Sequence, residues 1–387
     1  MNKKLLFNIT EDWFFCSHFL DRALAAKKAG YSIFVLSKMS NKKDIFDNYG
    51  MNFISAPFKR KSTNPFYEFY ILIRIILIYK RVRPDIVHHV AAKPIIYGSI
   101  AAKICRIKSV INAPVGMGYV FTSDNIKAKV LRPLVKILFK FFIDSHNGIN
   151  KRNKIIFENK EDLKYFIKLG AVDPKNACII QGAGVKIKQN YKPRESKEIP
   201  TIALVARMLK DKGINEFVEA ARIVNREKIF GNFLLVGDID PGNPSSLKRQ
   251  TLAKWNEDKV IKWVGWIENV GEILKKTDIL CLPSYREGLP KALIEGAAYG
   301  LPIVTTNTIG CKDVVEDGVN GFLVPIKNVE QLSKRIFELI QNKDLRNKMG
   351  MESFKIASNK FSSKIINTQT LNVYNEMFFE LKDKKTI

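Results

Sequence analysis

Short apolar runs typical of β-strands alternate with helical stretches along this chain of 387 residues, and this alternation constrains the fold more than any other feature. Parallel strands covered by helices on both faces have this pattern, because each crossover between them needs a helix. The sequence therefore predicts an α/β protein with doubly wound parallel sheets. The runs that we predict to be strands are 5–9, 32–36, 52–55, 86–89, 109–112, 202–205, 233–236, 260–264, 279–282 and 302–305.

The chain is too long for one ordinary hydrophobic core, so we expect two domains. Residues 187–200 are polar, charged and interrupted by prolines, as in an interdomain linker. We place an N-terminal domain at residues 1–188 and a C-terminal domain at residues 199–361. The tail Ser362–Phe379 predicts a last amphipathic helix.

The segment Pro283–Glu295, PSYREGLPKALIE, holds two glutamates, Glu287 and Glu295, on either side of a Gly/Pro turn and an apolar run. The strand-like segment Asp278–Leu282 comes directly before it. A strand, a tight turn and a helix in this order aim backbone N–H groups at a bound anion. Two carboxylates beside that anion can accept hydrogen bonds from sugar hydroxyls. The segment therefore suits a nucleotide-sugar.

Two cations, Arg207 and Lys212, lie in the run ARMLKDKG directly after the predicted strand Ile202–Val205. Side chains at the carboxyl end of a parallel strand face the ligand crevice. Two cations there could hold a diphosphate and stabilise the charge that grows as it leaves. A solvated helix start is the alternative for these two residues alone.

Together these segments closely resemble glycosyltransferase family 4, which has the GT-B fold of two facing Rossmann-like domains. The resemblance covers nearly the whole chain and is densest from Arg207 to Pro325, including KKTDILCLPSYREGLPKALIEGAAYGLPIVTTNTIGCKDVVEDGVNGFLVP. It implies an N-terminal domain that binds the acceptor and a C-terminal domain that binds the nucleotide-sugar. It also implies that a C-terminal helix, about residues 362–387, crosses back to the N-terminal domain.

The resemblance also implies roles for individual residues. Arg207 and Lys212 match the diphosphate-binding cations, Glu287 matches the glutamate that contacts the donor sugar, and Glu295 matches the one that binds the ribose. The other donor-binding candidates are the helix start Gly288, Leu289, Pro290 and Lys291, and the nucleotide-base candidates Trp263 and Trp266. An exposed helical glutamate is the alternative for Glu295.

Members of the family retain the anomeric configuration, and no enzyme nucleophile is obvious here. The resemblance therefore implies front-face attack, in which the acceptor hydroxyl enters beside the departing diphosphate and that diphosphate takes the proton. We identify no Asp-x-Asp metal motif, and two cations can replace the charge of a metal ion, so we expect no metal. The nucleotide-sugar is a substrate, so we expect no cofactor. The five cysteines are scattered without a CxxC pair, which argues against a zinc site.

The candidates on the acceptor side lie in the N-terminal half. His18, in a segment that resembles a bacterial subgroup building surface polysaccharides, either faces the crevice or caps local structure. His88 or His89 ends a predicted strand, where family members often place a histidine, and one of the two is expected to pack in the core. Lys93 follows them, and the turn Gly116–Gly118 could let backbone approach a phosphate.

Positive charge is concentrated in the N-terminal half. Residues 1–200 contain 36 Lys and Arg against 15 Asp and Glu, whereas residues 201–387 contain 28 against 23. Two basic amphipathic segments, 66–83 and 129–142, lie in this half; the second has Lys129, Arg132, Lys136 and Lys140 along one helical stripe. Each segment could lie on an anionic membrane surface or pack on a core with a solvated basic face, and the charge favours the membrane.

These patterns favour a hexosyltransferase that uses a nucleotide-sugar, expected to be a UDP-sugar, and a lipid-linked saccharide acceptor. A nucleotide-sugar epimerase of the same fold, a nucleic-acid-binding protein and a catalytically dead membrane scaffold are the alternatives. We expect no nucleic-acid partner, because no zinc-finger spacing or interleaved aromatic RNA-binding run is present. Since Leu5–Ile9 is too short for the apolar core of a signal peptide, we expect a cytoplasmic protein at the inner face of the membrane.

Overall fold

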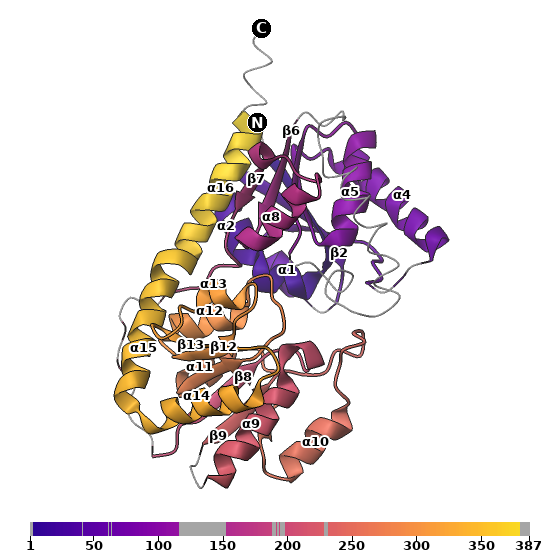
Figure 1. Cartoon of the computed structure of the whole chain (residues 1–387). Coiled ribbons are helices and arrows are strands. Elements are labelled where there is room, and N and C mark those ends of the chain that lie inside the picture. Colours follow the sequence, from indigo (N-terminus) through magenta and orange to yellow (C-terminus); the bar gives the residue numbers. More distant parts are fainter. Residues whose placement is uncertain are drawn as a thin grey trace. The chain divides into compact units, whose positions relative to one another are not determined.

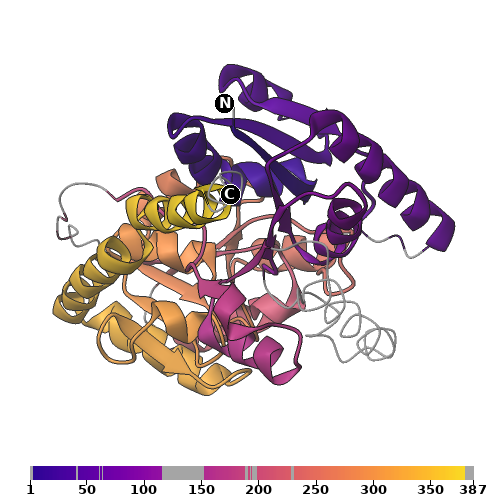
Figure 2. The same ribbon diagram turned by 90° about the horizontal axis from the view of Figure 1, so that it is seen from above.

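The computed structural model describes residues 3–40, 42–60, 62, 64–115, 152–187, 191, 193, 198–227 and 231–379. The chain divides into two compact units, which are described separately. Unit 1 contains residues 1–183 and 364–387, and unit 2 contains residues 184–363. Figures 1 and 2 show each unit as a sheet covered by helices.

Unit 1 is built on a sheet of seven parallel strands in the order β3-β2-β1-β4-β5-β6-β7. These strands are β1 (Lys3–Glu11), β2 (Tyr31–Lys38), β3 (Asn52–Ser55), β4 (Ile86–Val90), β5 (Ser109–Ala113), β6 (Arg152–Phe157) and β7 (Ala177–Ile179). The order reverses beside β1, which is the doubly wound arrangement. The helices are α1 (Asp12–His18), α2 (Leu20–Lys28), α3 (Lys43–Asn48), α4 (Pro65–Val82), α5 (Ala92–Ile104), α8 (Lys160–Lys168) and, from Lys364 onward, α16 (Ser363–Phe379).

Helices cover both faces of this sheet. Successive residues of β1 join different cores, since Leu5 and Phe7 pack with α1, α2 and α16 while Leu6 packs with α4 and α5. This burial on both sides explains the unbroken apolar run that the sequence shows there. The last helix belongs to the first of these cores: Tyr374 is fully buried, and the Ser109 hydroxyl donates to the Met377 carbonyl over 2.8 Å.

Unit 2 has a second parallel sheet, in the order β10-β9-β8-β11-β12-β13. Its strands are β8 (Thr201–Val205), β9 (Asn232–Val236), β10 (Lys262–Trp263), β11 (Ile279–Leu282), β12 (Ile303–Thr306) and β13 (Gly321–Val324). Its helices are α9 (Ile214–Arg226), α10 (Arg249–Glu257), α11 (Val270–Lys276), α12 (Lys291–Ala298), α13 (Cys311–Val314), α14 (Val329–Gln341) and α15 (Lys343–Ile356). The order again reverses beside the first strand, between β8 and β11.

The α/β, doubly wound prediction is confirmed, and so is the packing of the C-terminal helix on the N-terminal sheet. Strands β6, β7 and β13 were not predicted. The stretch predicted to be strand over 260–264 forms only the two residues of β10. Within the described residues, no helix combines the length and apolarity that a membrane crossing requires.

Candidate active site

Two connections leave neighbouring strands of unit 2 at the same edge of the sheet. One follows β8 and contains Arg207 and Lys212, and the other follows β11 and begins at Pro283. Backbone and side-chain bonds join them, since Tyr285 N and Ser284 Oγ both donate to the Asp211 carbonyl, over 2.9 and 3.1 Å. Because strand order reverses between β8 and β11, this is where an open α/β sheet forms a ligand crevice.

The structure brings Lys212 and Glu287 together although 75 residues separate them in the chain. Lys212 Nζ lies 2.5 Å from Glu287 Oε1, and the two side chains are 16% and 12% exposed. An ammonium has three donors and a carboxylate has about four lone-pair positions, so the contact leaves both groups able to bind more. The pair therefore offers a donor for a phosphate oxygen and an acceptor for a hydroxyl at one place.

The sequence pattern predicts a helix over 212–224, but in the structure Lys212 lies in a separate turn before that helix. Residues Lys210–Lys212 form one 3₁₀ turn, and α9 begins only at Ile214. Gly213 between them has φ +72°, and a Cβ at this position would lie 2.1 Å from the Pro283 carbonyl oxygen. Glycine is therefore required both for the backbone angle and for the close approach of the two connections.

Arg207 makes an ion pair that the sequence prediction did not include. Its Nη1 lies 2.6 Å from Asp240 Oδ2, in the connection after β9, and its side chain is 43% exposed. A guanidinium carries five N–H donors, so one carboxylate does not use its capacity. The carboxylate was identifiable in the sequence, because Asp238 and Asp240 directly follow the strand Phe233–Val236.

Asp238 and Asp240 also bear on the expectation that no metal is needed. They form an Asp-x-Asp pair, which can be a metal-binding motif and which the sequence reasoning overlooked. Asp238 Oδ2 lies 2.9 Å from Arg249 Nη2, and Asp240 is paired with Arg207. Among the residues that the structure describes, no cluster of three or more His, Cys, Asp or Glu side chains could hold a metal ion.

The second connection ends at the start of helix α12. Threonines of the next strand and the turn after it hold its backbone: Thr305 Oγ1 donates to the Leu282 carbonyl over 2.6 Å and Thr308 Oγ1 to the Tyr285 carbonyl over 2.9 Å. Pro290 is the N-cap of α12 and supplies no side-chain cap. The backbone from Gly288 to Lys291 therefore forms a helix start suited to an anion.

Glu295 and Lys291 lie one turn apart on α12 and form an ion pair, with Nζ 3.1 Å from Oε1. Both are about one quarter exposed, at 29% for Lys291 and 24% for Glu295. A surface pair of this kind contributes little to stability, so a ligand can separate it at small cost. Leu289, another predicted donor contact, is 8% exposed and packs in the core of unit 2.

The two predicted tryptophans have different environments. Trp263 Nε1 donates to the Gly237 carbonyl over 2.9 Å, and the Arg249 guanidinium lies 5.1 Å from its ring centroid. Trp266 is 65% exposed. Trp263 is thus fixed to the connection after β9, whereas Trp266 offers a ring face for stacking.

In unit 1, His88 and His89 are adjacent on β4, and their side chains point to opposite faces of the sheet. His89 is fully buried among α4 and α5, with Nε2 2.9 Å from the Tyr79 hydroxyl and Nδ1 2.9 Å from Asn112 Oδ1. Both ring nitrogens are bonded, which makes His89 a packed core residue rather than part of a ligand surface.

His88 is also fully buried, but only one of its nitrogens is bonded. Nδ1 lies 2.8 Å from the Tyr374 hydroxyl, and Nε2 has no hydrogen-bond partner within the described part of the chain. Nearby Arg22, which the sequence reasoning missed, is 4% exposed; its Nη2 donates to the Gly182 carbonyl and its Nε is likewise unpartnered there. The signal in the sequence was the helical spacing, because Arg22 lies on the buried face of α2 with Ala23 and Ala26.

The other acceptor-side candidates are placed as follows. His18 stacks on Phe14, with ring centroids 4.2 Å apart. Lys93 Nζ donates to the Lys59 and Ser62 carbonyls over 2.9 and 2.7 Å and pairs with Glu68 at 2.7 Å, so it ties the starts of α4 and α5 together. Gly116, Gly118 and the basic segment 129–142 lie outside the described residues.

Two doubly wound parallel sheets, one of them with Lys212 and Glu287 paired beside a helix start at its carboxyl edge, are the architecture of glycosyltransferases of the GT-B class. The family described as Glycosyl transferases group 1 matches residues 185–355, and the family Glycosyl transferase 4-like matches residues 4–145. The chain belongs to the group 1, or family 4, glycosyltransferases and has their GT-B fold.

Relatives with names that specify a reaction include two bacterial enzymes. The N,N'-diacetylbacillosaminyl-diphospho-undecaprenol alpha-1,3-N-acetylgalactosaminyltransferase of Campylobacter jejuni is 26% identical over 91% of this chain and 93% of its own. The UDP-Gal:alpha-D-GlcNAc-diphosphoundecaprenol alpha-1,3-galactosyltransferase of Escherichia coli is 26% identical over 72% of this chain and 74% of its own. Anabaena HepE, solved with UDP-glucose, is similar in fold, with a TM-score of 0.74 at 16% identity over 96% of this chain and 99% of its own.

The two buried histidines predict a pH-dependent stability of unit 1. Burial lowers the pKa of His89 to about 4, and burial with the charge of Arg22 lowers that of His88 well below its usual range. Unfolded histidine titrates near ~6.5, so the unfolded chain binds more protons below that pH and stability falls as the pH drops toward 4. We expect His89 alone to remove about 2 kcal/mol between pH 7.5 and 5.

Hydrogen exchange of the peptides that cover β1 and β4, measured at both pH values and corrected for the intrinsic rates, checks this expectation. In His89→Gln the pH dependence should shrink, whatever the change in absolute stability. An unchanged pH dependence in that variant would contradict the assignment.

The close approach at Gly213 predicts that Gly213→Ala separates the two connections. Gly318 has a similar φ, +74°, but nothing lies within 4 Å of a Cβ built on it, so Gly318→Ala is the matched control. The control should lose about 1 kcal/mol from the backbone angle alone. Gly213→Ala should lose about 1–3 kcal/mol more, because the Pro283 backbone must shift, and should also weaken nucleotide binding. Urea unfolding measures the loss of stability, and calorimetric titration with UDP measures the loss of binding. Equal losses of stability in the two variants would refute the prediction.

Proposed function

We propose that the protein transfers a sugar from a UDP-sugar to a polyprenyl-diphosphate-linked saccharide, with retention of configuration, in the synthesis of a bacterial surface polysaccharide. The pairing of Lys212 with Glu287 beside the start of α12 carries this proposal. It offers, at one place, an ammonium that can donate a hydrogen bond to a phosphate and a carboxylate that can accept one from a sugar hydroxyl. The names of the two bacterial relatives support the lipid-linked acceptor, and the name of the Escherichia coli relative supports the UDP-sugar.

Residues 199–361 would bind the donor. The diphosphate would lie against the Gly288–Lys291 backbone, with Lys212 and Arg207 donating to its oxygens. Glu287 would accept hydrogen bonds from the sugar and Glu295 from the ribose, after leaving Lys291. The exposed ring of Trp266 supports a stacking contact with the base, whereas Trp263 would position the adjoining connection.

The reaction would proceed by front-face attack. The acceptor oxygen forms its bond to the anomeric carbon on the face from which the UDP oxygen departs, and the hydroxyl proton passes to a phosphate oxygen. Lys212 and Arg207 would stabilise the negative charge that accumulates on the diphosphate, so the charge that a metal ion would supply comes from the protein. Positioning of the two substrates supplies the rest of the rate enhancement.

Residues 1–188 with 362–387 would bind the acceptor. His88 is the stronger candidate of the two histidines, because its Nε2 is the nitrogen without a partner among the described residues. Since the acceptor is a lipid, the enzyme would act on the inner face of the cytoplasmic membrane as a peripheral protein.

The direct test is a panel of UDP-sugars with undecaprenyl-diphosphate-linked saccharides, with products resolved by mass spectrometry and the new linkage assigned by NMR. We expect transfer from one donor with an α-linkage from an α-configured donor. Interconversion of the UDP-sugar in the absence of acceptor would instead indicate an epimerase. Neither transfer nor UDP binding across the panel would refute the proposal.

The roles of the central pair predict that Lys212→Ala lowers kcat by at least about 100-fold, because a cation that stabilises the departing charge is lost. Glu287→Gln should lower kcat by a similar factor, because the carboxylate that positions the donor sugar is lost. Matched controls on the same unit are Lys334→Ala, an exposed lysine of α14, and Glu219→Gln, an exposed glutamate of α9. The double variant should lose less than the product of the single losses, because the two side chains act together. Near-normal rates in either single variant, with folding intact by circular dichroism, would contradict the assigned roles.

A further inference from the structure

Helix α4 presents large apolar side chains to solvent along one stripe. Among the residues of this stripe, the exposed fractions are 86% for Phe66, 64% for Phe69, 47% for Tyr70, 39% for Ile73 and 55% for Leu77. Their spacings of three, four and seven residues place them on a single helical face. The solvent face of a surface helix is ordinarily polar, so this stripe needs an explanation.

Folding of unit 1 does not explain it. The opposite face of α4 supplies the packing against the sheet, through Ile71, Ile75, Tyr79 and Val82, all of which are buried. The outward side chains are additional to that core. An exposed apolar stripe of this length therefore marks an interaction surface.

The charged residues on the same face of α4 indicate the kind of partner that this surface fits. Arg74, Lys80 and Arg81 are exposed; Arg74 lies beside Ile73 within the length of the stripe, and Lys80 and Arg81 follow its last residue, Leu77. The one acidic residue of α4, Glu68, is 13% exposed and paired with Lys93. The outward face thus combines aromatic and aliphatic groups with positive charge and presents no carboxylate, a combination complementary to anionic lipid.

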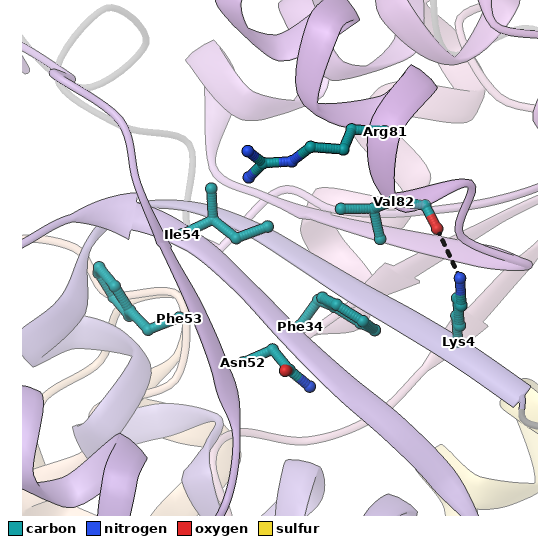
Figure 3. A pocket seen from close by; sticks show the side chains of 7 residues that line it. All are labelled: Lys4, Phe34, Asn52, Phe53, Ile54, Arg81 and Val82. Atoms are coloured by element: carbon teal, nitrogen blue, oxygen red, sulfur yellow. Dashed lines mark hydrogen bonds between the residues drawn. The ribbon is translucent and has the colours of Figure 1, made fainter.

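A groove beside the last turn of α4 extends this surface. Its volume is 340 Å³, and its walls come from Lys4, Phe34, Asn52, Phe53, Ile54, Arg81 and Val82. Figure 3 shows the Arg81 side chain reaching over the apolar Ile54, while Lys4 Nζ donates to the Val82 carbonyl over 3.0 Å. The C-terminal end of α4 therefore combines a positive charge with apolar side chains, as the exposed face of the helix does.

The aromatic end of α4 is attached to the edge of the sheet where the strands of unit 1 end. Lys93, three residues after the end of β4, joins the Lys59 and Ser62 carbonyls to Glu68 on the first turn of α4. In both views the N-terminal turns of α4 extend beyond the rest of the helical layer (Figures 1 and 2). The stripe therefore begins at the edge at which β4, the strand of His88, also ends.

We propose that the stripe Phe66, Phe69, Tyr70, Ile73 and Leu77 docks on an anionic lipid bilayer, with α4 lying in the boundary between headgroups and acyl chains and with Arg74, Lys80 and Arg81 on the phosphates. Docking in this orientation holds the carboxyl edge of the unit 1 sheet at the bilayer. The consequence for the acceptor, which rests on the proposed function, is that a lipid-linked saccharide reaches this edge while its chain stays in the membrane.

The first test measures binding of the full chain to vesicles of phosphatidylglycerol and phosphatidylethanolamine by co-sedimentation. The variant Phe66→Ser/Phe69→Ser/Leu77→Ser should bind on the order of 100-fold more weakly, because three large apolar groups no longer enter the interface. The control, Val319→Ser/Ile326→Ser/Met351→Ser, removes three exposed apolar residues of unit 2 and should bind normally. Equal binding by the two triple variants overturns the proposal.

The second test separates charge from apolar contact. Arg74→Gln/Lys80→Gln/Arg81→Gln should weaken binding to the same vesicles by about 100-fold, at roughly fivefold for each cation near the surface. Lys254→Gln/Lys334→Gln/Lys343→Gln removes the same charge from exposed positions of unit 2 and is the control. Wild type should prefer anionic vesicles to phosphatidylcholine vesicles; equal binding to both overturns the electrostatic part.

A second copy of this chain is the competing occupant of the stripe. Sedimentation velocity without vesicles distinguishes the two. A wild-type dimer that the Phe66/Phe69/Leu77 triple variant converts to monomer, with vesicle binding unchanged, overturns the proposal. An oligomeric state that the triple substitution leaves unchanged supports bilayer docking.

The last test keeps docking distinct from catalysis. With acceptor embedded in anionic vesicles, the triple apolar variant should lose transfer in proportion to its lost binding. With a short-chain acceptor in aqueous solution it should retain the wild-type rate. Loss of the rate with both acceptors contradicts the proposed role of α4, whereas no transfer by wild type with either acceptor refutes the proposed function and leaves the vesicle result standing.

Discussion

The reversal of strand order beside the first strand of each sheet is the constraint on which the rest of the structure depends. In a parallel sheet all connections that follow strands leave at one edge, and where the order reverses two of them diverge and leave a crevice. In unit 2 this brings the connections after β8 and β11 together, and with them Lys212 and Glu287. The equivalent position in unit 1 lies between β1 and β4, beside His88.

The two connections of unit 2 that carry Lys212 and Glu287 are held in place by contacts within the protein. Gly213 allows the two connections to touch, threonines of β12 and the turn after it hold the second connection, and the ion pair orients both Lys212 and Glu287. Groups that are already oriented need not reorganise when charge develops, which is the main source of electrostatic catalysis. Arg207 and Glu295 are held more loosely, in pairs with Asp240 and Lys291 near the surface, and are the groups that a ligand can redirect most easily.

Much of this could be predicted from the sequence, for identifiable reasons. Runs such as Ile202–Val205 are apolar throughout because both faces of the strand are covered, so the parallel sheets could be predicted. The helix start after Pro290 was readable from the Gly/Pro turn. The sequence prediction gave wrong bounds for the strand at 260–264 and for the start of α9. The length of β10 depends on how much of it pairs with β9 at the edge of the sheet, and the start of α9 depends on the backbone angle of Gly213. Arg207 and Asp240 each follow a predicted strand, but the sequence did not show that they would pair. Their pairing depends on β8 and β9 being neighbours in the sheet.

The sequence by itself determined the α/β class, the family and the segments that carry chemistry, since these depend on local periodicity and on residue types at short spacing. Only the tertiary structure decided which of the two adjacent histidines packs in the core with both ring nitrogens hydrogen-bonded. Alternation along β4 places His89 against Tyr79 and Asn112, whereas His88 Nε2 has no hydrogen-bond partner among the residues that the structure describes. The tertiary structure likewise decided which face of α4 is buried, because several faces of this apolar helix could pack on a sheet and only the packing shows which one is exposed.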